Sequence, residues 1–452
     1  MNTNRRTPLA AALLLTSLAS NAATVVHPSV ETRGHFDDAA GGYVDVDDPA
    51  IWIHPTDSTA SLVVSTLKEG GIDVYGLDGK LIQHLSPSDA PACQPAQKDC
   101  AGNRGGRINN ADLIYDFSLA GTPVDLIVAS DRGLDTLAIY RVDIDGSGPT
   151  LLSEVTGDSV QYIFANNQDE INQGNTAYGL ATVKTDKNLA FVSQNSTTAI
   201  AVLELFENEA HQVDYRQLHL LEFPSSFPLA DGSMWTPCAD DDESRPQFEG
   251  MVADTSNNKL YLAQENVGVW RIALDRPDDQ SQWELFARIR DYGVPYTRTW
   301  DAEEEEFVCE IDYAQGGSEG SDYLYADVEG LTIYEAAGKD GYLLVSSQGN
   351  NTVAVYERQG DNRYLGSFEV TDGEIDGVNE TDGMMVTNVN LGGAFPGGLL
   401  VMQDGQNSPV VYDKNAQIRE GSNFKFVSWA DIAKKMGLTV DTSTQPRATS
   451  SK

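Results

Sequence analysis

Short acidic segments recur along this chain, each placed directly before an apolar run. Asp47 and Asp48 precede one such run, Glu249 another and Asp382 a third. In four of six such segments, a glycine directly follows the acid or the tyrosine that stands in its place. Carboxylates gathered at one place repel one another, so these residues could bind a hard divalent cation. The six segments are residues 47–52, 110–114, 177–180, 248–252, 328–332 and 381–385.

A second apolar run follows each acidic segment at roughly the length of a hairpin and ends in a polar turn. A third apolar run, such as residues 353–356, then begins. Strand, turn and strand repeated every 40 to 80 residues or so is typical of a β-propeller, in which each blade covers its neighbour's apolar face. Six repeats predict an all-β fold, a six-bladed β-propeller. The second runs start at residues 62, 126, 189, 260, 343 and 399, and the polar turns cover residues 68–71, 131–133, 194–196, 264–266, 348–351 and 403–407.

In a propeller, equivalent strand ends converge on one rim of the central channel. The acids before the first strands and the turns after the second strands should therefore form one ring, in which Lys68 and Arg132 are the evident cations. Oxygen ligands without histidine or thiolate favour calcium over zinc. Each acid taken singly could instead be a solvated turn residue, but the whole set favours a metal site. The ring comprises Asp47, Asp48, Asp112, Tyr178, Glu249, Glu265, Asp327, Glu329, Asp376, Asp382 and Asp404.

The N-terminal segment and the charge of the 452-residue chain indicate its compartment and partners. Arg5-Arg6, the apolar run 9–18 and the small residues 20–22 have the layout of an export signal. We therefore expect a signal peptide over residues 1–23, a propeller domain over 24–440, a disordered tail over 441–452, and a secreted or periplasmic protein. No later stretch has the ~20 apolar residues of a membrane span. The net charge of −38 argues against nucleic acid and against an anionic membrane as partners.

Four cysteines agree with an oxidising compartment. Cys93 and Cys100 lie in one loop, and Cys238 and Cys309 flank the fourth repeat. Local pairings of 93 with 100 and of 238 with 309 are therefore favoured among the three possible connectivities. The acidic runs 240–243 and 303–306 lie in long insertions around the fourth repeat, and we interpret them as solvated surface loops.

Several motifs resemble those of the β-propeller phytases, and they occur in order over nearly all of the chain after the N-terminal segment. They are "DDPAIW" (47–52), "INNADLIYDF" (108–117), "ASDRG" (129–133), "FEGMVAD" (248–254), "DVEGLTIY" (327–334), "SSQGNNTVAVYERQG" (346–360), "DGVNETDGM" (376–384) and "FKFVSWADIA" (424–433). The resemblance implies a calcium-dependent 3-phytase. Such an enzyme removes phosphate from phytate (myo-inositol hexakisphosphate), a small-molecule substrate presented as calcium phytate.

The resemblance also implies roles for individual residues. Lys68, Arg132 and Tyr178 match phosphate-contacting residues, and Gln348 matches a polar residue that lines the site. Asn195-Ser196 stands where the family has a Lys-Glu pair, so binding of a second phosphate should be weaker. The implied catalytic set is Lys68, Arg132, Tyr178, Glu249, Glu265, Asp327 and Glu329. The matching calcium ligands are Asp48, Glu249, Glu265, Asp327, Glu329, Asp376 and Asp382, to which the ring adds Asp47 and Asp404.

These assignments lead to a mechanistic hypothesis. Several calcium ions would bridge carboxylates to phosphate, and a metal-activated water would attack phosphorus in line, without a covalent nucleophile. Activity should peak at neutral to mildly alkaline pH, because acid protonates the ligands. Two alternatives stay open: a calcium-dependent propeller lactonase or phosphotriesterase, and a non-enzymatic extracellular binding propeller. We expect a monomer, because a closed ring leaves no repeat over.

Overall fold

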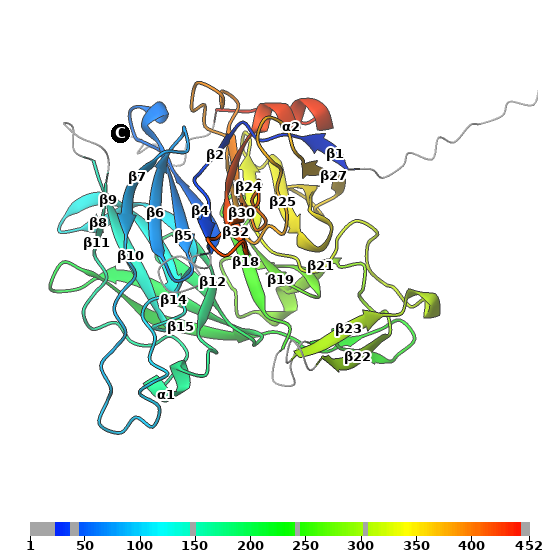
Figure 1. The fold of residues 1–452 in the computed structure, drawn as a ribbon, viewed down its shortest axis with the longest axis horizontal. Helices are drawn as coiled ribbons and strands as arrows, with labels where there is room; N and C mark the ends of the chain where they lie inside the picture. The colour runs from blue at the N-terminus through cyan, green and yellow to red at the C-terminus, as the bar shows by residue number, and fades with distance from the viewer. Residues whose placement is uncertain (1–22, 37–44, 145–150, 240–244, 302–305, 444–452) are drawn as a thin grey trace, which may run out of the picture.

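The computed structural model describes residues 23–36, 45–144, 151–239, 245–301 and 306–443. Six antiparallel sheets of consecutive strands radiate from a common centre, with β4, β12, β18 and β24 near the middle of Figure 1 and β7, β11, β15 and β21 farther out. The prediction of a six-bladed β-propeller is confirmed.

The first three blades are regular four-stranded meanders, in which each strand pairs with the next along the chain. Polar turns separate their apolar strands, as the repeats predicted. Blade one contains β4 (Val46–Trp52), β5 (Leu62–Leu67), β6 (Gly71–Gly76) and β7 (Leu81–Leu85); blade two contains β8 (Ile108–Leu119), β9 (Thr122–Asp131), β10 (Thr136–Asp143) and β11 (Leu151–Glu154); blade three contains β12 (Ala177–Lys184), β13 (Asn188–Gln194), β14 (Ala199–Glu207) and β15 (Val213–Glu222).

The last three blades follow the same plan, but the sixth takes its outer strand from the start of the chain. Blade four contains β18 (Phe248–Asp254), β19 (Lys259–Gln264), β20 (Gly268–Ala273) and β21 (Glu284–Arg288); blade five contains β24 (Leu331–Glu335), β25 (Gly341–Ser347), β26 (Thr352–Glu357) and β27 (Tyr364–Val370); blade six contains β28 (Met384–Thr387), β29 (Leu399–Asp404), β32 (Gly421–Ser428) and β2 (Val30–Glu31).

The N-terminal strands close the ring. β2 pairs antiparallel with β32, and β3 (His35–Phe36) pairs with the other end of the same strand. β1 (Thr24–Val26) adds to blade five as a parallel partner of β27, and α2 (Trp429–Met436) packs against β1, β27 and β32. An N-terminal strand, β2, and the last strand, β32, therefore share a sheet, which closes the ring.

The hydrophobic core lies between the blades. Five buried apolar clusters link blade one to two, two to three, three to four and five, five to six, and six back to one. Ile72 and Ala129 belong to the first of these interfaces, and Tyr75 and Phe426 to the last. Because each blade buries its faces on both neighbours, the sheets stabilise one another around the axis.

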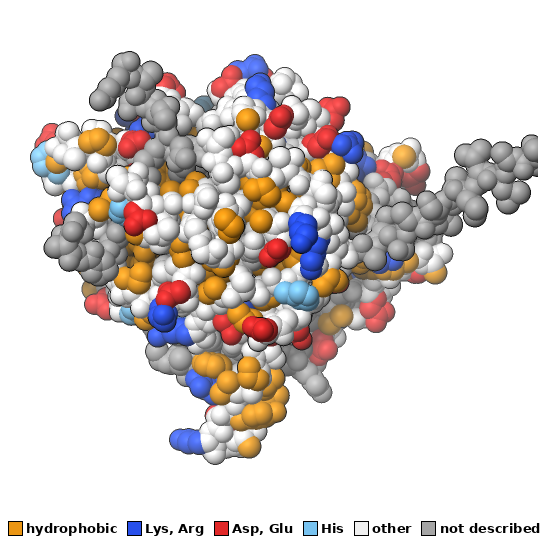
Figure 2. All heavy atoms as spheres, turned by 90° about the horizontal axis from the view of Figure 1, so that it is seen from above, with side chains coloured by type: hydrophobic (Ala, Val, Ile, Leu, Met, Phe, Trp, Pro, Cys, Tyr) orange, Lys and Arg blue, Asp and Glu red, His pale blue; other side chains and the backbone are white. Residues whose placement is uncertain are grey.

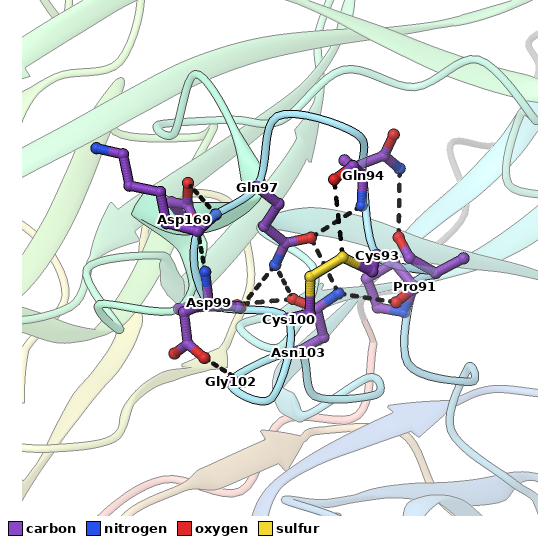
Figure 3. The surroundings of a disulfide bond; sticks show 12 residues. Pro91, Cys93, Gln94, Gln97, Asp99, Cys100, Gly102, Asn103 and Asp169 are labelled. Atoms are coloured by element: carbon purple, nitrogen blue, oxygen red, sulfur yellow. Dashed lines mark hydrogen bonds between the residues drawn. A yellow bond between two sulfur atoms is a disulfide. The ribbon is translucent and has the colours of Figure 1, made fainter.

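Both predicted disulfides are formed. The Cys93–Cys100 loop rests on α1 (Gln168–Ile171), where the Asp169 carboxylate accepts hydrogen bonds from the backbone N–H groups of Lys98 and Asp99 (Figure 3). The Cys238–Cys309 bond ties the segment before blade four to β23 (Glu306–Ile311), which forms a hairpin with β22 (Tyr296–Asp301). Disulfides are typical of proteins outside the cytoplasm.

Residues 1–22 and 444–452 lie outside the described part of the chain, as do 240–244 and 302–305. The predicted signal peptide, most of the predicted tail and most of the two acidic runs therefore stay predictions. No helix within the described ranges is long and apolar enough to cross a membrane. On the face seen in Figure 2, acidic and basic side chains are interspersed with apolar and uncharged ones, so the negative charge does not form one patch there.

Candidate metal and phosphate site

The acidic segments form β-bulges at the starts of the inner strands. The pairing register shifts between Val46 and Pro49 in β4, and between Phe248 and Met251 in β18. It shifts at the equivalent places in β8 and β12. Asp47-Asp48, Asn109-Asn110, Tyr178-Gly179 and Glu249-Gly250 are the residues within these shifts. A bulge frees two side chains from the regular alternation and redirects them, which here places polar groups in the central region of the propeller.

The glycines that follow the acids allow the inner strands to approach closely. A Cβ on Gly179 would lie 2.1 Å from the carbonyl oxygen of Glu249, and one on Gly250 would lie 2.1 Å from that of Glu329. Gly383 lies against the inner strand of blade one in the same way. The inner strands contact one another in blade order around the axis. The acid-glycine pairs therefore bring carboxylates of successive blades together.

Three of these carboxylates form a compact cluster, which we name the central acid group: Glu249, Glu265 and Glu329. Each contributes one oxygen atom, and these atoms all lie within 4.8 Å of one another. Glu249 and Glu329 are only 3 % and 5 % exposed. They come from β18 and from the segment before β24, and Glu265 follows β19 directly. The ring geometry expected from the sequence thus brings acids from blades four and five into one site.

The hydrogen bonds that reach the central acid group come from neutral donors among the described residues. The Tyr178 hydroxyl donates to Glu249 Oε2 at 2.6 Å, and Asn109 Nδ2 donates to Glu249 Oε1 at 2.8 Å. Gln247 Nε2 donates to Glu265 Oε2 at 3.0 Å. Asn109 and Gln247 were not predicted, although both stand within one or two residues of a predicted acid or bulge. These donors orient the carboxylates without neutralising them.

Two oxygen atoms of the group are left without a hydrogen-bond partner within the described part of the chain. They are Glu265 Oε1 and Glu329 Oε2, both buried. Burial raises the pKa of both carboxyls well above the usual range, and the charges of neighbouring carboxylates raise it further. A set of carboxylate oxygens with unsatisfied buried acceptors fits a hard cation such as calcium.

Lys68 forms a second charged cluster beside blade one. Its Nζ lies 3.1 Å from Asp45, 3.3 Å from Asp382 and 3.6 Å from Asp47. Burial lowers the pKa of Lys68, but the charges of Asp47 and Asp382 raise it well above its usual value. Burial also raises the pKa of Asp382 to about 7, and Gln348 Nε2 donates to Asp382 Oδ1 at 2.8 Å. Both oxygens of buried Asp47 have no hydrogen-bond partner among the described residues.

Asp48 and Asp112 join neighbouring blades. Asp48 Oδ2 accepts a hydrogen bond from the backbone N–H of Ala111 at 3.1 Å, which links blade one to blade two. Asp112 Oδ2 accepts one from the backbone N–H of Thr182 at 2.6 Å, which links blade two to blade three. Burial raises the pKa of Asp112 to about 6. These two acids thus contribute to contacts between blades, and the assignment of Asp48 as a calcium ligand stays a prediction.

Arg132 and Tyr178 lie side by side next to the central acid group. The Arg132 guanidinium is 4.9 Å from the centre of the Tyr178 ring and donates to Asn109 Oδ1 at 3.1 Å. Burial, together with the charge of Glu249, raises the pKa of Tyr178 well above its usual value, so the hydroxyl stays protonated. Arg132 and Tyr178 line a cavity of about 620 Å³ together with Glu265 and Asp327. Four residues predicted for phosphate or metal binding therefore share one cavity.

Asp376 and Asp404 belong to a different cluster, which we name the Lys425 group. Lys425 is fully buried on β32 and contacts Asp376, Glu31 at 2.8 Å and Asp404 at 3.3 Å. Asn407 accepts a further hydrogen bond from its Nζ at 2.8 Å. Lys425 was not predicted as part of a site, because it lies on the third strand of its blade and far from any acidic segment. The assignment of Asp376 and Asp404 as calcium ligands stays a prediction.

Comparison with known proteins identifies the family. The model of the phytase family matches residues 5–227 and 296–451. A 3-phytase of Bacillus subtilis (strain 168) is 31 % identical over 418 residues, which cover 92 % of this chain and 87 % of that protein.

Solved structures align at low similarity. A protein of unknown function from Bacteroides thetaiotaomicron VPI-5482 aligns over 89 % of this chain and 75 % of its own, with 10 % identity and a TM-score of 0.42. Sqt1 of Chaetomium thermophilum, bound to the N-terminus of ribosomal protein L10, aligns over 87 % of this chain and 100 % of its own, with 12 % identity and a TM-score of 0.39. The six-bladed assignment comes from the strand pairing of this chain itself. By the family match over most of its length and its identity to the bacterial enzyme, the chain belongs to the phytase family, whose members release phosphate from phytate.

Proposed function

We propose that this phytase hydrolyses phytate in a calcium-dependent manner, with calcium bound by the central acid group. The observation that carries this proposal is the close approach of three carboxylates, within 4.8 Å, that receive only neutral hydrogen-bond donors among the described residues. Asp327 and Asp382 would complete the ligand set from blades five and six. Phosphate would be bound by Lys68, Arg132 and Tyr178, with Gln348 lining the site.

Electrostatics supports a bound cation. At an effective dielectric constant of ~20, two unit charges about 4.8 Å apart repel by ~3.5 kcal/mol. Three ionised glutamates give three such pairs, and a protein with a net charge of −38 must also approach a polyanionic substrate. A divalent cation between carboxylates and phosphate removes both repulsions. When bound, calcium supplies Lewis-acid activation of water and neutralisation of charge that develops on phosphate oxygens.

The side chains around the metal ligands would act on the phosphate itself. Arg132 can donate two parallel hydrogen bonds to phosphate oxygens, because its planar guanidinium matches their geometry. Tyr178 stays protonated, since burial raises the pKa of this group, and its one proton, donated to Glu249 in this structure, could pass to a phosphate oxygen when a cation binds Glu249. Lys68 carries a charge that three nearby carboxylates hold in place. These groups would bind the phosphate and orient it for attack.

The two alternatives fit this site less well. A lactonase or phosphotriesterase acts on a substrate with little charge, whereas Lys68 and Arg132 are suited to a phosphate anion. A purely structural calcium site would not require Arg132 and Tyr178 to face the same cavity as the acids. Phosphate ester hydrolysis accounts for both features, and it agrees with the family to which the chain belongs.

Three further assignments are part of the proposal. Residues 24–440 would form one catalytic domain that works as a monomer. Residues 1–23 would direct export and residues 441–452 would form a disordered tail. The two disulfides support a location outside the cytoplasm, either periplasmic or secreted.

Release of inorganic phosphate from calcium phytate tests the proposal. The purified protein should be active with calcium, inactive after chelation with EGTA, and active again when calcium, but not magnesium, is restored. Calorimetric titration of the chelated protein with calcium should show binding in the absence of substrate. Undiminished activity in excess EGTA would refute the calcium dependence, and no phosphate release under any condition would refute the activity.

A further inference from the structure

The second strand of each blade carries a buried residue at the same place, directly before its last residue. Five of the six residues are polar, and all six are at most 1 % exposed. Polar side chains buried to this degree bond to other groups of the protein. Those of five blades bond to the acidic segments that start the inner strands. In blade order, the residues are Thr66, Ser130, Ser193, Ala263, Ser346 and Gln403.

Ser193 shows the arrangement most clearly. Its Oγ accepts a hydrogen bond from the backbone N–H of Gly179, in its own blade, at 2.8 Å. The same hydroxyl donates to the carbonyl oxygen of Phe248, in blade four, at 2.5 Å. Gly179 directly follows Tyr178, and Phe248 directly precedes Glu249. One hydroxyl therefore ties the backbone beside Tyr178 to the backbone beside Glu249.

Ser130 and Ser346 connect other neighbouring blades. Ser130 Oγ accepts a hydrogen bond from the backbone N–H of Asn110 at 3.1 Å and donates to the carbonyl oxygen of Tyr178. Ser346 Oγ donates to the carbonyl oxygen of Thr381, in the acidic segment of blade six, at 3.1 Å. Blade two is thereby tied to blade three, and blade five to blade six, at their acidic segments.

Gln403 makes the same connection with an amide in place of a hydroxyl. Its Oε1 accepts a hydrogen bond from the backbone N–H of Asp382 at 2.8 Å. Its Nε2 donates to the carbonyl oxygen of Val46, in blade one, at 3.4 Å. Blade six is thereby tied to blade one. We name the four side chains that join successive blades in this way the clip residues: Ser130, Ser193, Ser346 and Gln403.

Each clip residue holds a carbonyl that belongs to, or directly precedes, a residue predicted to bind metal or phosphate. A carbonyl and the Cα of the next residue lie in one peptide plane, so a hydrogen bond to the carbonyl also fixes where the next side chain begins. The residues placed in this way are Tyr178, Glu249, Asp382 and Asp47.

We infer that the clip residues are positioning residues for the reaction, which act through the backbone of the acidic segments. This inference rests on the proposed function, which makes Glu249 a calcium ligand and Tyr178 a phosphate contact. The β-bulges interrupt the ladder at these segments, so additional hydrogen bonds are needed to hold them. Ligand oxygens must lie about 2.3–2.6 Å from calcium. A displacement of about 1 Å at a reacting site can reduce the rate about 100-fold.

The test uses Ser193→Ala in the full chain, with calcium phytate as substrate. We expect kcat to fall about tenfold, because Glu249 is no longer held in place. Calcium should bind about fivefold more weakly in a calorimetric titration of the chelated protein without substrate, since ligand positions set the affinity. This second measurement does not depend on turnover.

Ser61→Ala is the matched control. Ser61 is 1 % exposed, lies directly before β5 and accepts a hydrogen bond from the backbone N–H of His54 at 3.1 Å. It is thus a buried hydroxyl at the end of a second strand that is opposite to the acidic segments. Both variants should lower the melting temperature, because each leaves a buried backbone group without its partner. Only Ser193→Ala should change kcat and calcium affinity.

Two further variants separate the hydroxyl from the volume of the side chain, and metal binding from phosphate binding. Thr66 bonds to the backbone of Asp48 from the equivalent position of blade one. Ser193→Thr should therefore keep kcat within about threefold of the wild type. Ser130→Ala releases the carbonyl of Tyr178, so kcat/KM should fall about tenfold while calcium affinity stays within about twofold.

Three results would overturn the inference. They are a Ser193→Ala protein with the kcat and calcium affinity of the wild type, a Ser61→Ala protein with the same losses as Ser193→Ala, and a Ser193→Thr protein as impaired as Ser193→Ala. The last would assign the effect to packing and not to the hydroxyl. A wild-type protein that releases no phosphate and binds no calcium would instead refute the proposed function, and this inference with it.

Discussion

The central acid group and the Lys425 group are built from the same kinds of residue and differ in where their positive charge comes from. In the Lys425 group, a fully buried ammonium contacts Glu31, Asp376 and Asp404. Burial lowers the pKa of Lys425, but hydrogen bonds to Asp376 and Glu31 raise it above its usual value, so the lysine stays charged. Asp404 Oδ2 has no hydrogen-bond partner among the described residues, but it lies 3.3 Å from the ammonium, so a cation of the chain itself faces the acids of this cluster.

The central acid group receives a tyrosine hydroxyl and two amides instead of an ammonium, within the described part of the chain. Two of its oxygens have no hydrogen-bond partner there. The comparison teaches that an acidic cluster indicates a metal only where the chain itself brings no cation. The first cluster should therefore depend on an external ion for function, and the second should depend on Lys425 for stability.

The largest expected effect comes from the central acid group. Glu329→Gln keeps the shape of the side chain and removes one ligand charge, so phosphate release should fall at least ~1000-fold, or ~4 kcal/mol of transition-state stabilisation. The melting temperature in EGTA should stay equal or rise, because carboxylate repulsion is relieved. Glu209→Gln, at an exposed position, is the control. A Glu329→Gln enzyme that keeps its activity would show that function does not depend on the full charge of the central acid group.

Removal of the Lys425 ammonium should reduce the stability of the fold and leave catalytic activity unchanged. Lys425→Met leaves buried carboxylates without a partner, which should lower the free energy of unfolding by ~3–5 kcal/mol. Urea denaturation measures this loss, and activity per folded molecule should be retained. Lys187→Met is the control, because this lysine is 43 % exposed and lies 3.4 Å from Glu204.

Added calcium tests whether an external cation can replace the Lys425 ammonium. Without Lys425, the oxygens of Glu31, Asp376 and Asp404 form a set that resembles the central acid group. Millimolar calcium should therefore recover part of the stability of Lys425→Met, and should do so more than in Lys187→Met. A Lys425→Met protein as stable as the wild type would show that burial of this ammonium contributes nothing to the fold.

Arg132→Ala should give an intermediate effect. The guanidinium would contact phosphate in both the bound substrate and the transition state, so KM should rise and kcat should fall together. We expect kcat/KM to decrease by about 10- to 100-fold, as for the loss of one or two charge-assisted hydrogen bonds. Steady-state kinetics on calcium phytate measures both constants. A change in KM alone would reduce Arg132 to a residue that binds the substrate without acting on the reaction.

The last prediction concerns the pH dependence of stability without calcium. Burial raises the pKa of Asp382 to about 7 and raises those of Glu265 and Glu329 well above their usual values. The folded protein then holds more protons than the unfolded chain above about pH 4, so the free energy of unfolding falls as pH rises from about 5 to 7. Each such group contributes up to ~1.4 kcal/mol per pH unit.

Calcium should cancel this trend, because a bound cation favours the ionised carboxylates. Melting temperatures measured between pH 5 and pH 8, in EGTA and in calcium, would show a calcium-induced increase that grows with pH. A calcium-induced increase in melting temperature that is the same at pH 5 and at pH 8 would mean that the carboxyls with raised pKa are not among the calcium ligands.

Much of the architecture could be predicted from local sequence. The six repeated segments correctly marked the starts of the inner strands, and in four of them a glycine stands where a Cβ would collide with the next blade. The structure places Glu329 and Asp382 just before β24 and β28, whereas Asp47 and Glu249 lie inside β4 and β18. The β-bulges that redirect these residues were not predicted, since a register shift depends on the partner strand.

The contacts that distinguish the two acidic clusters could not be predicted from local sequence. Glu31 and Lys425 are 394 residues apart and meet because β2 pairs with β32. Asp48 and Asp112 were predicted as members of the acidic ring, and each also accepts a backbone hydrogen bond from the next blade, which no local pattern indicated.

The sequence by itself determined the number of blades, the ring of acids and the family, because these follow from residue types repeated along the chain. Only the tertiary structure decided which acids contact a lysine, which join blades and which receive only neutral hydrogen-bond donors among the described residues. The physical reason is that charge compensation depends on distances of a few ångströms between segments that strand pairing and ring closure bring together, and no local pattern encodes those distances.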